Sequence, residues 1–245
     1  LHVGLYSLVL IVWALFWFAL AILVNSRGNG SARNALVLVG LWIVLVIVVP
    51  GLVHVAVDTL HPAPSRMELV HEAREATKDA DKKLTKMTGR HKVDPKVQRS
   101  DRAKRELAAL EEIAKRSTPV VKALQEQIKR RNTLTENLRF LSPAIVVQLA
   151  LEDLAGAGTT RHARFEAHVE RFHATFRGYF AEKIRAGTLL TPDDIRAIPT
   201  PRFTEEPAGA LASRILWGVF ALFLAVVLLV GIAWPRLARI GRLAR

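Results

Sequence analysis

Three long apolar runs without a formal charge constrain this chain more than any other feature of its sequence. They cover residues 3–24, 35–57 and 215–234. A helix of about 20 apolar residues, rising ~1.5 Å per residue, crosses a hydrocarbon core of ~30 Å. A buried helix of a soluble protein is the alternative, or a signal peptide for the first run. Three such runs in one chain favour membrane helices, and the first run lacks a basic n-region and a small-residue cleavage site.

The charged residues are distributed in the same way. The chain carries 35 Lys and Arg and 22 Asp and Glu, which gives a formal net charge of +13. All 22 acidic residues and 28 of the basic ones lie in the region 58–206, whose net charge is therefore +6. The flanking segments contain seven basic residues and no acidic one. Because a carboxylate in hydrocarbon is energetically costly, this distribution is expected when both ends of the chain are embedded.

Basic residues in the short segments predict the orientation. The loop NSRGNGSAR contains Arg27 and Arg33, and the C-terminal tail PRLARIGRLAR contains four arginines. Short positive segments stay in the cytoplasm, so the first helix runs inward, the second outward and the third inward. We expect a multi-pass protein of the cell (inner) membrane, with residues of about 58–210 extracytoplasmic and the C-terminus cytoplasmic. The chain starts with Leu1, close to a helix start, which suggests a fragment preceded by more membrane helices.

The predicted fold is an all-α membrane protein with three transmembrane helices and an all-helical extracytoplasmic domain inserted between the second and third. The predicted segments are 1–57, with two transmembrane helices joined by a short cytoplasmic loop; 58–210, the extracytoplasmic domain; and 211–245, the last transmembrane helix with its basic tail. No segment has convincing strand alternation. The chain has no cysteine, so packing rather than disulfides must stabilise the domain.

The stretch HPAPSR joins the second transmembrane helix to this domain. Pro62 and Pro64 end the membrane helix, while Ser65 and Glu68 form a capping box for the helix that follows. Arg66 stands where it could meet lipid phosphates or an acidic neighbour. We predict that these five residues form a rigid structural joint that transmits tilting of the membrane helix outward.

Further patterns predict helices within the domain. An apolar stripe from Leu107 to Ile128 marks one long helical region, which Pro119 is expected to divide into two helices. A later helix places six large apolar residues three or four positions apart, a spacing typical of a packed core. These residues form a phenylalanine-rich stripe and are Phe165, Val169, Phe172, Phe176, Phe180 and Ile184. Thr191 caps a short helix, and the proline-rich segment 198–207 returns the chain to the membrane as an extended strap.

One short helix differs from the others. In LSPAIVVQLALEDLAGAG, Ser142 is the expected N-cap and Gly156 or Gly158 the expected end. Residues 144–151 are apolar on nearly every face, but the run is too short to span a membrane. It is either a central buried helix, or a helix that lies at the membrane surface or lines a site for an apolar substrate. In the second case the contact residues are Ile145, Val146 and Leu149.

His54 lies near the outer end of the second transmembrane helix, four residues before Asp58. A titratable group in a span is a candidate functional residue. The alternative is a residue solvated at the interface by water and Asp58. We keep His54 as a possible substrate or membrane-surface contact.

The sequence offers no catalytic, cofactor-binding or metal-ligating residue. There is no phosphate-binding loop of the type G-x-x-x-x-G-K-[ST]. The segment HEARE lacks the second histidine of a zinc peptidase motif. His162, Glu166, Glu170 and His173 share a helix face, but no matching ligands are visible on other helices. No feature points to nucleic acid as a partner.

Several features in order resemble the ABC-2 type transporter permeases that carry a large, uncharacterised helical insert outside the membrane. They are the span LWIVLVIVVPGL, then HPAPSR, the loop HKVDP, the helix LSPAIVVQLALEDLAGAG, the segment RHARFEAHVERFHATFRGYF and a closing span. The family loop typically reads His-Pro, whereas three residues separate His91 from Pro95 here. A Gly-Thr pair of the family pattern is partly kept at Gly158-Thr159.

The resemblance implies the membrane subunit of an exporter, with six spans in the complete subunit. The implied partners are the lipid membrane, an ABC ATPase subunit that binds ATP and Mg, and a second permease subunit in a homodimer or heterodimer.

Two other hypotheses remain. One is a membrane-anchored structural or sensory protein whose exported domain binds a partner or ligand. The other is a membrane-bound hydrolase, which the absence of a nucleophile or metal constellation makes the weakest.

Overall fold

The structure is a computed structural model that describes residues 2–28, 30–62, 67, 70, 71, 74, 75, 78, 79, 82 and 95–243. Within these ranges it contains helices, turns and extended connections but no strand. Three helices are long and apolar enough to cross a membrane, namely His2–Asn25, Ser31–Leu60 and Ala208–Arg239. The predicted all-α class with three candidate spans is therefore confirmed.

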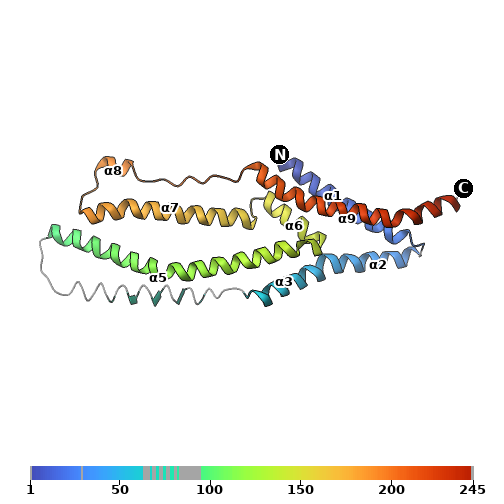
Figure 1. The fold of residues 1–245 in the computed structure, drawn as a ribbon, viewed down its shortest axis with the longest axis horizontal. Coiled ribbons are helices and arrows are strands. Elements are labelled where there is room, and N and C mark those ends of the chain that lie inside the picture. Colours follow the sequence, from blue (N-terminus) through green and yellow to red (C-terminus); the bar gives the residue numbers. More distant parts are fainter. Residues whose placement is uncertain are drawn as a thin grey trace. The chain divides into compact units, whose positions relative to one another are not determined.

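The helices are named in chain order in Figure 1. The first span is α1 (His2–Asn25). The second consists of α2 (Ser31–Ile43), the π-helix η1 (Val44–Val48) and α3 (Val49–Leu60). The middle of the chain forms α5 (Pro95–Leu138), the 3₁₀-helix η2 (Arg139–Leu141), α6 (Pro143–Leu154), α7 (Thr159–Ala186) and α8 (Pro192–Arg196). The last span lies in α9 (Ala208–Leu243).

The chain divides into two compact units. The first contains Leu1–Leu60, Arg131–Arg164 and Thr204–Arg245, and the second contains His61–Arg130 and Phe165–Phe203. The segment 131–164 thus belongs to the same compact unit as the candidate spans. The predicted boundaries at 57 and 210 concern the membrane, and they stay a prediction.

The first unit has a continuous apolar core. α1 buries residues that recur at helical spacing, and they pack against buried residues of α9 such as Ile215 and Leu222. Figure 1 shows α1 and α9 side by side and running in the same direction, while the second span runs the opposite way. These directions agree with the predicted order of inward, outward and inward. The side of the membrane on which each end lies stays a prediction.

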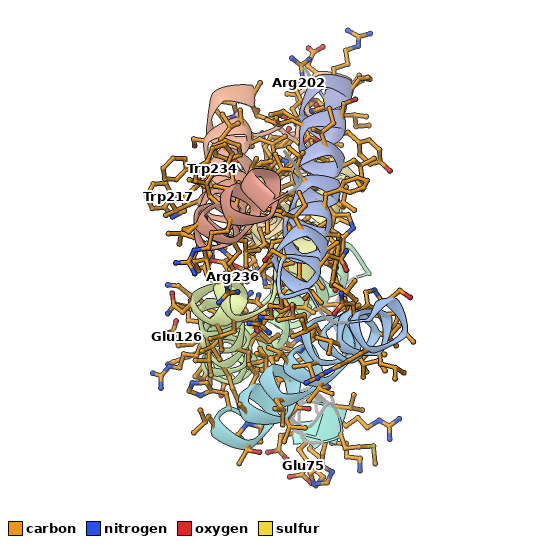
Figure 2. All side chains as sticks on the ribbon, turned by 90° about the vertical axis from the view of Figure 1, so that its right-hand side faces the viewer. Glu75, Glu126, Arg202, Trp217, Trp234 and Arg236 are labelled. Atoms are coloured by element: carbon orange, nitrogen blue, oxygen red, sulfur yellow. The ribbon has the colours of Figure 1, made fainter. Side chains whose placement is uncertain are left out.

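Two tryptophans mark the lipid-facing side expected for α9. Trp217 and Trp234 have exposed fractions of 62% and 67%, and both project from α9 on the side away from α1 (Figure 2). Trp217 and Trp234 are 17 positions apart in the sequence, which corresponds to about 25 Å of helix. Tryptophans at this separation suit the two interfaces of a membrane.

In the second unit, α5 and α7 run antiparallel. Gln125 donates to Glu170 across the pair at 2.8 Å, and Arg185 forms an ion pair with Glu111 further along at 2.5 Å. α8 is capped as predicted, because Thr191 accepts from the Asp194 amide at 3.2 Å while the Asp194 side chain accepts from the Thr191 amide at 2.9 Å.

Two predictions about this unit need correction. Pro119 does not divide the helix, since α5 continues through it. A proline removes one helical hydrogen bond and bends a helix rather than always ending it, and the adjacent Thr118 hydroxyl bonds back to the Ala114 carbonyl at 2.6 Å. The phenylalanine stripe is not a buried core. Its rings contact one another, yet Phe165 and Phe176 keep exposed fractions of 48% and 37%.

The predicted joint is only partly visible. The Pro62 carbonyl accepts a hydrogen bond from Gln127 Nε2 at 2.6 Å, which ties the start of the joint to α5. Pro64, Ser65, Arg66 and Glu68 lie outside the described residues, and so does the proposed capping box. The role of the joint stays a prediction.

Candidate functional site

The most informative part of the first unit is a helical hairpin made by the end of α5, η2 and α6, called the 131–154 hairpin below. Its first arm runs alongside the second span, starting from the Leu60 end of that span. Arg131 forms an ion pair with Asp58. Further along, Leu134 and Leu138 pack against a buried cluster that includes Val53 and Val57. The arm thus descends beside α3 for several turns.

The tip of the hairpin reaches the middle of the second span. Ser142 is fully buried, and its Oγ donates to the carbonyl oxygen of Leu45 at 2.5 Å. Leu45 is the fifteenth residue of the thirty-residue span Ser31–Leu60. About 22 Å of helix lies on each side of Leu45. Leu45 is therefore near the middle of any membrane that this span crosses.

The sequence explains why the Leu45 carbonyl needs this donor. In the π-helix η1 the Val49 amide bonds to the Val44 carbonyl, five residues back. The next amide in this register would belong to residue 50 and would bond to Leu45. Residue 50 is Pro50, which has no N–H. The Ser142 hydroxyl therefore supplies the hydrogen bond that Pro50 cannot, as neighbouring Ser and Thr side chains do in membrane helices.

The second arm, α6, returns in contact with both α1 and α9, which also pack against each other. Ser142 caps it as predicted by accepting from the Ala144 amide at 3.1 Å. Val147 and Ala150 are buried in the same apolar cluster as α1 and α9. On α9, a Cβ atom at Gly218 would lie 3.2 Å from Val146 Cγ1, so the two helices are in close contact at this point.

A cluster of ion pairs holds the C-terminal end of α6. The Arg214 guanidinium of α9 pairs with Asp153 of α6 at 2.7 Å and with Glu206 of the strap at 3.0 Å. Gly156 ends α6 with φ of +73°, as the sequence predicted. A Cβ atom at Gly158 would lie only 2.0 Å from Asp153 Oδ1, so the turn after α6 requires glycine there.

A second ion pair fixes the strap. Arg161 binds both carboxylate oxygens of Glu205, at 3.0 Å from Nε and 2.5 Å from an Nη atom. This bidentate contact lowers the pKa of Glu205 below its ordinary value and raises the pKa of Arg161. The pair lies outside the candidate spans and ties the start of α7 to residues just before α9.

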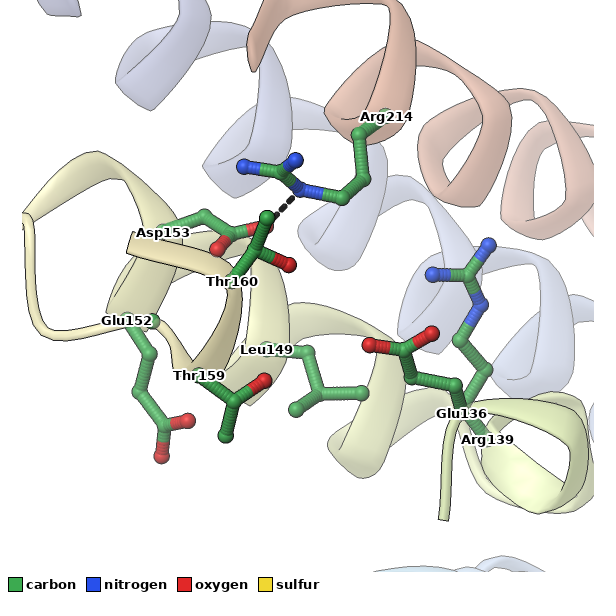
Figure 3. A pocket seen from close by; sticks show the side chains of 9 residues that line it. Glu136, Arg139, Leu149, Glu152, Asp153, Thr159, Thr160 and Arg214 are labelled. Carbon is green, nitrogen blue, oxygen red and sulfur yellow. Dashed lines mark hydrogen bonds and ion pairs between the residues drawn. The ribbon is translucent and has the colours of Figure 1, made fainter. Parts of the chain in front are cut away.

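A small recess opens beside this cluster (Figure 3). About 290 Å³ of space, part of it open to the surroundings, lies between its side chains. Most of the lining residues are polar or charged, and both signs of charge are present. It consists of Glu136, Arg139, Leu149, Glu152, Asp153, Gly158, Thr159, Thr160 and Arg214.

The residues proposed from the sequence lie in three environments. Ile145 and Val146 are buried, with exposed fractions of 8% and 6%. Leu149 lines the recess. His54 is exposed and contacts Asp58, with 3.2 Å between Nε2 and Oδ2. A role for these four residues in contacting substrate or membrane stays a prediction.

Sequence reasoning missed the polar residues of the hairpin. Pro50 inside an apolar run is the signal for an unpaired carbonyl, while the local pattern around Ser142 indicates only a helix cap. Arg139 and Asp153 belong to no motif, because their proximity to Arg214 of α9 arises only in the folded chain.

Comparisons with known proteins give one match. A family described as a domain of unknown function, DUF3526, matches residues 66–204. This is more than half of the chain, and it includes the 131–154 hairpin, α7 and α8. No curated protein and no solved structure matches the chain.

Proposed function

The chain belongs to the DUF3526 family, and from this membership we propose that it is a membrane-spanning permease subunit of an ABC-2 type exporter. DUF3526 domains occur in ABC-2 type transporter-associated proteins. The order of spans and exported helices in the sequence resembles such permeases, and the three candidate spans support a membrane location. The subunit would move a substrate across the cytoplasmic membrane. The region of about 58–210 would lie outside, except that the 131–154 hairpin reaches back among the spans, and the C-terminus would lie in the cytoplasm.

The observation that carries this proposal is the 131–154 hairpin. It enters the unit of the candidate spans from the end at Leu60 and Ala208, and it stops at mid-span against Leu45. Hydrogen bonds and ion pairs at both ends of α6 hold the hairpin. A polar-tipped hairpin that fills half the depth of a helix bundle suits a gate, because its withdrawal would open that half.

The energy for such a motion would come from a partner. We propose that an ABC ATPase subunit binds ATP and Mg, and that a second permease subunit, identical or related, completes the pathway. The chain itself is then not an enzyme. The hairpin would move when ATP binding shifts the spans relative to one another.

Disulfide trapping of the hairpin tests this proposal. The chain has no cysteine, so Val146→Cys with Gly218→Cys introduces a single possible pair, at a separation that suits a disulfide. We expect the tagged chain to co-purify with a P-loop ATPase. In that complex, ATP with vanadate should change the rate of disulfide formation severalfold.

The two single-cysteine variants are the matched controls, and neither should form the intramolecular disulfide. A stable complex without any P-loop ATPase would contradict the proposal. A disulfide rate that ATP does not change would contradict the gate. Either result would favour the alternative of a structural or sensory membrane protein.

A further inference from the structure

The recess beside α6 contains ionisable side chains that form no ion pair with any described residue. Arg214 is neutralised by Asp153 and Glu206. Glu136, Glu152 and Arg139 form no ion pair with any described residue, although Glu152 accepts from Gln148 at 2.9 Å. The recess therefore presents two carboxylates and one guanidinium without counter-charges.

Arg139 is the most unusual of the three. It lies three residues before Ser142, whose hydroxyl marks the middle of the second span. Its Nε is buried and has no hydrogen-bond partner among the described residues. The guanidinium lies 4.7 Å from the centre of the Phe140 ring. A charge at membrane depth is costly without a partner and often marks a functional site.

Because the recess carries charges of both signs, it restricts the charge that a ligand can have. A simple anion near Arg139 would also face Glu136 and Glu152, and a simple cation near those carboxylates would face Arg139. A zwitterion satisfies both signs, and the hydroxyls of Thr159 and Thr160 add hydrogen-bonding capacity. An anionic phosphate on Arg139 and an ammonium group shared by the two carboxylates would give each of these three side chains a partner of opposite sign.

The surroundings indicate that this zwitterion belongs to a lipid. The recess extends from Thr159 and Arg214, near the Ala208 end of the last span, to Arg139 beside the hairpin tip, where Phe140 and Leu141 are 48% and 58% exposed. A headgroup in the recess could therefore place its acyl chains along apolar side chains that lie deeper. Leu149 provides apolar lining within the recess itself.

We propose that the recess binds the headgroup of a zwitterionic phospholipid with a primary amine, its phosphate on Arg139 and its ammonium on Glu136 and Glu152. This inference depends on the membrane location in the proposed function. It does not depend on an ATPase or on transport, so the lipid can be a substrate or a regulator of the gate.

Lipid binding to the purified full chain tests the inference. Native mass spectrometry would compare the retention of phosphatidylethanolamine, phosphatidylcholine and phosphatidylglycerol, each added alone. We expect phosphatidylethanolamine to be retained most strongly. Glu136→Gln should reduce this preference, and Arg139→Gln should weaken retention of all three about tenfold, the effect of losing one charge-assisted hydrogen bond.

Matched controls come from the exposed pair Glu126 and Arg130 of α5, which lies outside the recess with 3.8 Å between its charged atoms. Glu126→Gln and Arg130→Gln should leave retention unchanged. The thermal midpoint of each variant shows whether it is folded. If Arg139→Gln does not fold, Glu136→Gln still tests the inference.

Three results would overturn the inference. One is equal retention of phosphatidylethanolamine and phosphatidylglycerol, and another is unchanged selectivity in a folded Glu136→Gln variant. The third is equally tight binding of water-soluble glycerophosphoethanolamine, which would assign the recess to a free zwitterion. A failed trapping experiment with intact lipid binding would instead contradict only the transport function.

Discussion

Ser142 and Leu45, 97 residues apart in sequence, are joined by a hydrogen bond of 2.5 Å from the serine hydroxyl to the leucine carbonyl. The same hydroxyl accepts from the Ala144 amide and so caps α6. One side chain thus satisfies the carbonyl left by Pro50 in the second span and the free amide at the start of α6. The two helices are coupled through this oxygen.

Ser142→Ala should destabilise the protein. The substitution leaves the Leu45 carbonyl without a donor, at a cost of ~1–3 kcal/mol, and removes a helix cap worth ~1 kcal/mol. The measurement is the unfolding midpoint of the purified chain in detergent. Ser142→Thr keeps a hydroxyl and is the matched control, which should lose less stability.

A second variant separates the two roles of Ser142. Pro50→Ala restores an N–H group that can bond within the span. In that background Ser142→Ala should cost less, because only the cap is lost, so the two substitutions should be non-additive. Strict additivity would show that the Ser142 hydroxyl does not replace the missing amide.

Gly158→Ala should weaken the contacts at the C-terminal end of α6. The added Cβ would lie 2.0 Å from Asp153 Oδ1, so Asp153 must leave its place beside Arg214. Gly178 offers a matched control, since a Cβ there meets nothing within 4 Å. Gly178→Ala should be neutral or stabilise α7 by ~0.5–1 kcal/mol. A thermal midpoint unchanged by Gly158→Ala would contradict the close approach.

Arg214→Gln should destabilise the same region more strongly. It leaves Asp153 and Glu206, whose side chains are 14% and 12% exposed, without a cation. A fully buried pair broken in this way costs ~3–5 kcal/mol, and a smaller loss is expected here because Arg214 is partly exposed. Adding Asp153→Asn should recover part of the stability by removing the unpaired charge.

The control for Arg214 is Arg196→Gln, which breaks an exposed contact with Asp193 at 3.3 Å. Such pairs contribute ~0–1 kcal/mol. Equal effects of the two arginine substitutions on the thermal midpoint would show that the Arg214 cluster has no special role.

The sequence predicted the features that depend on local chemistry. The lengths of the three uncharged apolar runs predicted the three candidate spans. The patterns at Ser142 and Thr191 predicted two helix caps that the structure contains. Pro119 was misjudged because a long helix can absorb a proline as a bend.

The site could not be predicted in the same way. Residues 144–151 gave no indication of which neighbours bury them, because apolar faces are similar on lipid-facing and core helices. The hairpin depends on contacts between residues as distant as Asp153 and Arg214, and the phenylalanine stripe shows that spacing alone does not establish burial.

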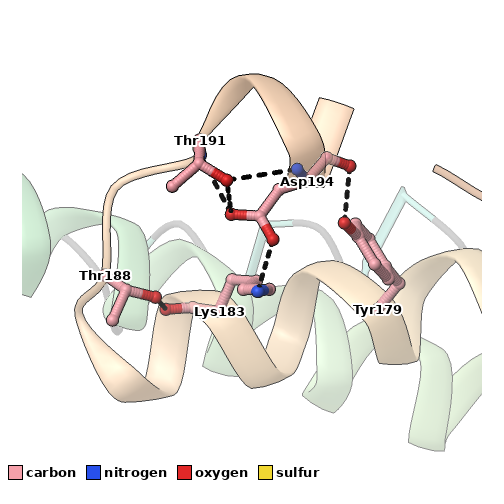
Figure 4. Close-up of polar contacts among 5 residues, drawn as sticks. All are labelled: Tyr179, Lys183, Thr188, Thr191 and Asp194. Atoms are coloured by element: carbon pink, nitrogen blue, oxygen red, sulfur yellow. Dashed lines mark hydrogen bonds and ion pairs between the residues drawn. The ribbon is translucent and has the colours of Figure 1, made fainter. Parts of the chain in front are cut away.

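The docking of α8 onto α7 should depend on acidic pH. Lys183 binds Asp194 at 2.7 Å, and Tyr179 donates to the Asp194 carbonyl at 2.6 Å (Figure 4). The Lys183 hydrogen bond, with those from Thr191, lowers the pKa of Asp194 from 3.8 to about 2.

Because the folded state lowers this pKa, it favours the charged carboxylate. Its contribution is therefore fully present above about pH 4 and is lost as the pH falls from about 4 to 2. Hydrogen exchange of the α8 amides, normalised to intrinsic rates at each pH, should show protection decreasing over this interval. Asp194→Asn should lower protection at pH 6 and remove this step, whereas Asp193→Asn, at an exposed side chain, should keep it. A step unchanged in Asp194→Asn would assign it to another carboxylate.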